Sequence, residues 1–214
     1  MSKLDEVADK KLLKTWKWQS KVDSCFTYLA LFLSPIIALF VKSDWNLPSF
    51  LKWFQTVDST MNGGGWGGDR SLGGGDRGFY EKWKEFYDKS PSYWRRVVVC
   101  FMWQWRNPAQ GFSYYRMGRS LPESYYVYQH PDSTRDWETT GTRNEYEGWY
   151  YVEVRDTETH KPVMFQYYEV QHYSKLNDKY AHRQNYGWKL NTIDKPLWGG
   201  RCMIVSSNNP VKKL

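Results

Sequence analysis

The sequence is poor in cysteine and lacks the common catalytic and metal-binding motifs. Its three cysteines, Cys25, Cys100 and Cys202, lie far apart and include no CxxC pair, which argues against a disulfide scaffold. Each lies in or beside an apolar stretch, which predicts buried thiols in a reducing compartment. The four histidines show no HExxH spacing, and no serine lies in a GxSxG motif. We therefore predict no catalytic residues, no metal site and no cofactor.

Aromatic side chains are the residues present in excess. The chain of 214 residues contains 13 Trp, 17 Tyr and 10 Phe, together 19% of the sequence. Such rings are enriched at protein interfaces and at membrane surfaces. The net charge of +7 comes from the N-terminal half, because residues 119–214 carry nearly equal numbers of basic and acidic side chains. This composition indicates a folded chain with aromatic contact surfaces.

The strongest single feature is an uncharged run of eighteen residues, Ser24 to Val41, bracketed by Asp23 and Lys42. As one helix it reaches about 27 Å, just short of a hydrocarbon core. More than twenty residues precede the run and no small-x-small site follows it, which argues against a cleaved secretory signal. Two alternatives stay open: a membrane-spanning or re-entrant segment, and a helical hairpin or kinked helix buried in protein. Either one is expected to be kinked near Pro35.

Helical spacing recurs on both sides of a glycine-rich tract. Residues 3–21 predict a lysine-rich amphipathic helix, and further helices are expected at 47–58, 79–89 and 93–107. The tract at 62–78 holds a repeated GGDR but no Gly-Lys-Ser/Thr ending and no preceding strand, so it is not a nucleotide site. We interpret it as a hinge or docking loop, with Trp66 as its anchor.

Beyond Tyr125 the apolar spacing changes to period two. Five segments rich in Val, Tyr, Trp and Phe alternate with polar or Pro/Gly breaks, which predicts antiparallel strands. The fold class is therefore α+β: a helical N-terminal half with one apolar kinked helix, followed by a small antiparallel β-meander or partly open barrel. We expect a helical region at 1–118, with its apolar segment at 24–41, and a β domain at 119–214.

Two sets of contact residues are predicted. The first set would contact lipid or an apolar protein partner: Leu31, Phe32, Ile36, Ile37, Phe40, Trp45, Trp53 and Trp66. The second set combines arginines for phosphates with tryptophans for stacking on bases, as in a nucleic-acid groove. Its members are Arg95, Arg96, Trp103, Trp105, Arg106, Arg116 and Arg119.

Three segments resemble a family of small proteins encoded by tailed bacteriophages. They are LPSFLKWFQTVDS at 47–59, WQWRNPAQGFSYYRMG at 103–118 and NYGWKLN at 185–191, after an apolar N-terminal stretch. The family has no biochemical function that we can state. The resemblance implies a viral protein made in the bacterial cytoplasm.

From these observations we expect a protein that is not an enzyme. It would be a bacteriophage structural or interaction protein, located in the virion or at the host inner membrane or cytoplasm. Its partners would be other phage proteins and the lipid bilayer, within an oligomer or larger assembly. The alternative is a phage protein that binds nucleic acid through residues 94–119.

Overall fold

The structure is a computed structural model that describes residues 2–55, 77–135, 147–171, 180–190 and 201–212. It divides the chain into two compact units. The strand unit contains residues 1–20 and 118–214, and the helical unit contains residues 21–117. This differs from the predicted division at 118, because the first twenty residues belong with the strands.

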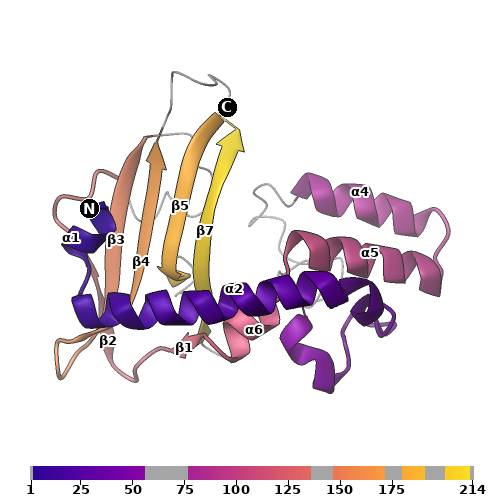
Figure 1. Cartoon of the computed structure of the whole chain (residues 1–214), viewed down its shortest axis with the longest axis horizontal. Coiled ribbons are helices and arrows are strands. Elements are labelled where there is room, and N and C mark those ends of the chain that lie inside the picture. The colour runs from indigo at the N-terminus through magenta and orange to yellow at the C-terminus, as the bar shows by residue number, and fades with distance from the viewer. Residues whose placement is uncertain (1, 56–76, 136–146, 172–179, 191–200, 213–214) are drawn as a thin grey trace. The chain divides into compact units, whose positions relative to one another are not determined.

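The strand unit is built on an open antiparallel sheet, which confirms the α+β class and the meander (Figure 1). Five strands follow in the order β2-β3-β4-β5-β7, and β1 and β6 form a separate pair. Their bounds are β1 Arg119–Ser120, β2 Tyr125–Gln129, β3 Gly148–Asp156, β4 Pro162–Gln171, β5 Tyr180–Trp188, β6 Arg201–Cys202 and β7 Ile204–Lys212.

The central strands β3 and β4 bury side chains on both faces of the sheet. On one face Tyr150 stacks on Tyr168 with ring centroids 5.4 Å apart. On the other face Tyr151 stacks on Phe165 at 5.7 Å. Such cross-strand ring pairs are the contacts that stabilise a sheet. Because both faces are buried, β3 and β4 carry aromatic and β-branched residues at positions pointing to either face of the sheet.

The N-terminal segment forms two helices where the sequence predicted one. Helix α1, Lys3–Val7, begins at Ser2, whose hydroxyl accepts from the amide of Asp5. The backbone is extended at Ala8. Helix α2, Lys10–Ala38, then begins next to Asp9, whose carboxylate accepts from the amide of Leu12 at 2.8 Å. A second capping residue thus restarts the helix.

The first part of α2 packs on the sheet through Trp16. Its ring lies 5.8 Å from that of Phe165 and 5.2 Å from that of Tyr186. Its indole nitrogen donates to the carbonyl of Val205 at 3.2 Å. Trp16 is 5% exposed, so residues 10–20 contribute to the core of the strand unit.

The second part of α2 continues through Pro35 and ends at Ala38, three residues before the predicted Val41. Proline has no amide hydrogen for the carbonyl of Leu31. The hydroxyl of Ser34 donates to that carbonyl instead, at 2.7 Å. This replacement bond explains how a helix interior accommodates the proline. The kink itself stays a prediction.

Among its described residues, the helical unit adds four helices to α2, and α4 and α5 run beside each other (Figure 1). They are the 3-10 helix η1 Ser49–Phe54, and the α-helices α4 Arg77–Asp88, α5 Tyr93–Arg106 and α6 Gln110–Tyr115. Sequence spacing predicted all except α6. The predicted 47–58 helix is shorter and tighter, and its last residues lie outside the described ones.

The core of the helical unit joins the end of α2 to α5. Its buried residues are Ile37, Ala38, Val41, Trp45, Leu47, Val97, Val99, Cys100 and Trp103. A second, smaller cluster holds Ala30, Ala109 and Phe112. In it Phe26 of α2 stacks on Phe112 of α6 with centroids 4.0 Å apart.

Candidate functional site

The second part of α2 exposes one whole apolar face. Its members recur at three- and four-residue spacing, so they share one side of the helix and of the turn that follows. Each is at least 42% exposed, and Phe32 reaches 82%. We call this set the outer apolar surface: Tyr28, Leu29, Phe32, Ile36, Leu39 and Phe40.

The outer apolar surface exists because residues 24–41 are apolar all round, while the described residues of the helical unit cover only the inner side. Ala30, Ile37 and Ala38 on the inner side are at most 5% exposed. An uncharged helix has no polar face to turn outward. Packing one side therefore leaves large rings and branched chains on the other.

Two rings of η1 extend the exposed apolar residues beyond α2. Phe50 is 73% exposed and lies 6.1 Å from Phe40, ring to ring. Trp53 is 43% exposed and lies 6.4 Å from the ring of Phe26. Contiguous exposed apolar residues of this kind mark contact sites for proteins or membranes.

The predicted lipid or partner contacts divide into three groups. Phe32, Ile36, Phe40 and Trp53 are exposed, and Leu31 is partly buried. The prediction is wrong for Ile37 and Trp45, which are 5% and 9% exposed because both belong to the core. Trp66 and most of the glycine-rich tract lie outside the described residues.

One of the two tryptophans in the predicted nucleic-acid-binding set is not available to a ligand. Trp103 is 0% exposed and belongs to the core, so its role as a stacking ring is wrong. Arg95 donates to the carbonyl of Phe86, and its guanidinium lies 4.7 Å from the Phe86 ring centroid. The guanidinium of Arg96 lies 5.8 Å from the Trp45 ring centroid. Both arginines thus serve contacts within the helical unit.

The remaining members of that set are divided between the two units. Trp105, Arg106 and Arg116 are exposed in the helical unit. Arg119 belongs to the strand unit, where its guanidinium lies 4.4 Å from the Trp188 ring centroid.

Glu153 is a buried acid in the strand unit, and buried acids are candidates for catalytic groups. Glu153 is 3% exposed. The hydroxyl of Tyr151 donates to one of its oxygens at 2.6 Å, and Arg155 Nε donates to the other at 2.7 Å. Burial, reinforced by Glu153, raises the pKa of Tyr151. With both oxygens bonded and almost no exposed surface, this group stabilises β3 as a charge-assisted network.

A second acid, Asp23, lies largely buried on α2 in the helical unit. Its carboxyl accepts a hydrogen bond from the hydroxyl of Ser113 at 2.5 Å. Burial raises the pKa of Asp23 to about 6, and the Ser113 bond opposes that rise. The side chain therefore changes charge close to neutral pH.

The cysteines follow the prediction at two positions. Cys100 and Cys202 are buried, and burial raises the pKa of the Cys100 thiol to about 12. The prediction is wrong for Cys25, which is exposed on α2. It lies one turn before Tyr28, on the outward side of the helix.

Sequence reasoning missed several exposed residues. Tyr28, Leu29, Leu39 and Phe50 belong to the exposed apolar residues but not to the predicted contacts. For Tyr28, Leu29 and Leu39, the three- and four-residue spacing from Phe32 or Ile36 was the available signal. It did not show which side of an all-apolar helix faces outward.

Within the described parts of the chain, no group of three or more metal-ligating side chains occurs.

Comparisons with known proteins place the chain in one family. No curated protein and no solved structure matches the sequence. A family of unknown function, DUF7338, matches residues 8–214, nearly the whole chain. The chain belongs to the DUF7338 family.

Proposed function

We propose that this protein is a non-enzymatic interaction protein that attaches to a membrane through the outer apolar surface of α2. The observation that carries the proposal is this uncharged helix face, which the helical unit leaves uncovered. Phe32 and Ile36 at its centre are 82% and 59% exposed. Leaving such side chains in water is unfavourable by about 25 cal/mol per Å² of apolar surface.

A buried core helix and a cleaved signal are both less well supported as roles for α2. Among the described helices, α2 alone is long and apolar enough to cross a membrane. A core helix of a soluble protein would be mostly buried. In α2, only 22% of the most apolar stretch is buried. Cleavage of a signal would remove Trp16, which packs against Phe165 and Tyr186 in the strand unit.

Attachment along the bilayer surface suits α2 better than a full crossing. Its inner side packs on α6 and holds the Asp23 carboxyl, so protein rather than lipid surrounds half of the helix. Exposed Lys21 and Lys42 bracket the apolar residues. Apolar residues flanked by lysines and aromatic rings are typical of helices that lie in the membrane interface.

The bacteriophage assignment joins this proposal through the sequence resemblance alone. In that setting the protein would assemble with other phage proteins at the host inner membrane or in the virion. Mass spectrometry of purified virions tests the two locations. Detection at stoichiometric amounts supports a virion component, and absence supports a role at the host membrane.

Flotation of the full chain with phosphatidylcholine and phosphatidylglycerol vesicles tests the membrane proposal. Wild-type protein should float with the vesicles. The double variant Phe32→Ser with Ile36→Ser should stay at the bottom, because it removes the two central apolar side chains without touching the core.

A matched control changes two exposed apolar residues of the strand unit. Tyr126 and Val127 on β2 are 37% and 40% exposed. The double variant Tyr126→Ser with Val127→Ser should float like the wild type. Failure of the wild type to float, or equal flotation of the Phe32 and Ile36 variant, would overturn the membrane proposal.

A further inference from the structure

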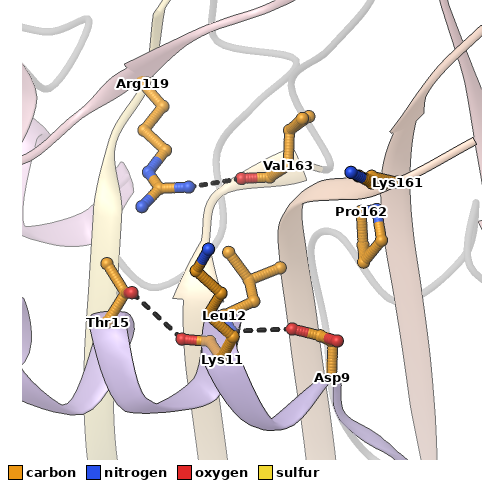
Figure 2. Close-up of a pocket in the computed structure, with 8 residues that line it drawn as sticks. All are labelled: Asp9, Lys11, Leu12, Thr15, Arg119, Lys161, Pro162 and Val163. Carbon is orange, nitrogen blue, oxygen red and sulfur yellow. Dashed lines mark hydrogen bonds between the residues drawn. The ribbon is translucent and has the colours of Figure 1, made fainter. Parts of the chain in front are cut away.

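The strand unit contains a cleft that the membrane proposal does not use. The cleft has a volume of about 530 Å³ and lies between the start of α2 and the strands (Figure 2). Three separate chain segments line it. Its residues are Asp9, Lys11, Leu12, Thr15, Arg119, Lys161, Pro162 and Val163.

Positive charge dominates this cleft. Lys11, Arg119 and Lys161 bring three cations, against the single carboxylate of Asp9. That carboxylate accepts the amide of Leu12 at 2.8 Å and so caps α2. Within the part of the chain that the structure describes, none of the three cations has an ion-pair partner. Three cations beside a single carboxylate leave an excess of positive charge, which favours an anion between them.

Arg119 is held in place before any ligand arrives. It donates one hydrogen bond to the carbonyl of Val163 at 2.6 Å, drawn in Figure 2. Its guanidinium lies 4.4 Å from the Trp188 ring centroid. Because water solvates its partly buried charge incompletely, the pKa of Arg119 is lowered. A fixed guanidinium loses little entropy when its remaining N–H groups bind oxygens.

We propose that this cleft binds a phosphate monoester carried on a partly apolar organic body. A ligand with two negative charges, such as a phosphate monoester, matches three cations better than a ligand with one carboxylate does. The fork of Arg119 suits two phosphate oxygens, and the exposed ammonium groups of Lys11 and Lys161 supply further donors. The volume exceeds that of a bare phosphate, and Leu12, Pro162 and Val163 offer apolar contacts to the ester group.

Calorimetric titration of the full chain with glycerol 3-phosphate, phenyl phosphate and inorganic phosphate tests the proposal. At low salt an organic monoester should bind, more tightly than inorganic phosphate, and binding should weaken as salt rises. Lys11→Gln and Lys161→Gln should each weaken binding about tenfold, as expected for a lost charge-assisted hydrogen bond. Both lysines are exposed, so neither change disturbs packing.

The matched control is Lys14→Gln. Lys14 is exposed on α2, one turn after Lys11, and does not line the cleft. The Lys14→Gln variant should bind the organic monoesters as tightly as the wild type. Equal losses in the Lys14 and Lys11 variants would overturn the site, since they would indicate a general effect of net charge.

A second arm distinguishes a soluble ester from a lipid headgroup. It uses the Phe32→Ser, Ile36→Ser background, so that the proposed apolar attachment does not contribute. Binding to phosphatidylcholine vesicles only when they contain phosphatidic acid, lost in Lys11→Gln, supports a lipid source. Binding of a soluble ester supports a metabolite source. No binding of any monoester, or binding of oligonucleotides alone, overturns the proposal.

Discussion

The two units use the same kind of side chain in opposite ways. In the strand unit the large rings of Tyr151, Phe165 and Trp188 are at most 1% exposed. In the helical unit Phe32, Phe50 and Trp94 are at least 67% exposed. The inner strands of the sheet are covered on both faces and bury these rings, whereas short helices packed along one side of α2 leave its other side exposed. Aromatic content alone therefore does not distinguish a core from a contact surface.

The largest effect is expected from removing a ring of the strand unit. Phe165 is 0% exposed and its ring lies near those of Trp16, Tyr151 and Trp188. Phe165→Ala should lower the free energy of unfolding by about 3–5 kcal/mol. Urea denaturation followed by tryptophan fluorescence measures the change. A loss as small as that of a surface substitution would show that Phe165 is not part of a packed core.

A smaller loss is expected where two helices of the helical unit meet. The amide of Gly111 donates to the carbonyl of Gln55 at 2.7 Å, which brings α6 against η1. A Cβ at Gly111 would overlap the carbonyl oxygen of Lys52 and lie 2.9 Å from that of Gln55. Gly111→Ala should cost about 1–3 kcal/mol by overpacking. Thermal unfolding measures it, and an unchanged melting temperature would contradict the close approach.

The largely buried Asp23 makes the helical unit sensitive to pH. Its pKa is raised from 3.8 to about 6, so the folded state holds the proton more strongly than the unfolded state. The resulting stability is fully present below pH 3.8 and is lost as the pH rises through about 6.

Asp23→Asn should therefore raise the free energy of unfolding at pH 7.5 by about 1–2 kcal/mol. It should also reduce the change in stability between pH 7.5 and pH 5. The amide oxygen of asparagine can still accept the Ser113 hydroxyl, so the bond is kept. Denaturation at the two pH values measures both effects. A variant less stable than the wild type at pH 7.5 would contradict the burial penalty.

The smallest effect on stability is expected at the centre of the outer apolar surface. Phe32→Ala, the same substitution as Phe165→Ala, should change the free energy of unfolding by less than about 0.5 kcal/mol, because the ring is exposed. The same variant should float less well with vesicles. The pair thus separates a ring that holds the fold from a ring available for contact. A large destabilisation by Phe32→Ala would remove the contrast between the two units.

Local spacing was a sufficient guide to most elements. The helix at 93–107 and the strands after Tyr125 were predictable because apolar residues recur at helical or alternating positions. Helix α6 was missed because it has six residues, too few to show a period. The break between α1 and α2 was missed because the apolar pattern continues across Ala8, while Asp9 restarts the helix.

The candidate sites were less predictable than the elements. Trp103 and Trp105 belong to the same helix, yet one is 0% and the other 57% exposed. Neither the composition nor the spacing of α5 separates them. The cleft was not predicted at all, because its three cations come from segments that meet only after the strand unit has folded.

The sequence by itself determined that the apolar run beginning at Ser24 forms a helix, which the structure ends at Ala38, and that the C-terminal half forms a sheet. Hydrogen bonding and side-chain periodicity within a short segment are sufficient for both. Only the tertiary structure decided that Ile36 faces outward while its neighbour Ile37 is buried in the core. An all-apolar helix has no preferred side of its own, so the elements packed against it select the buried face. The remaining face, which the described residues of the helical unit leave uncovered, is the one we propose for the membrane.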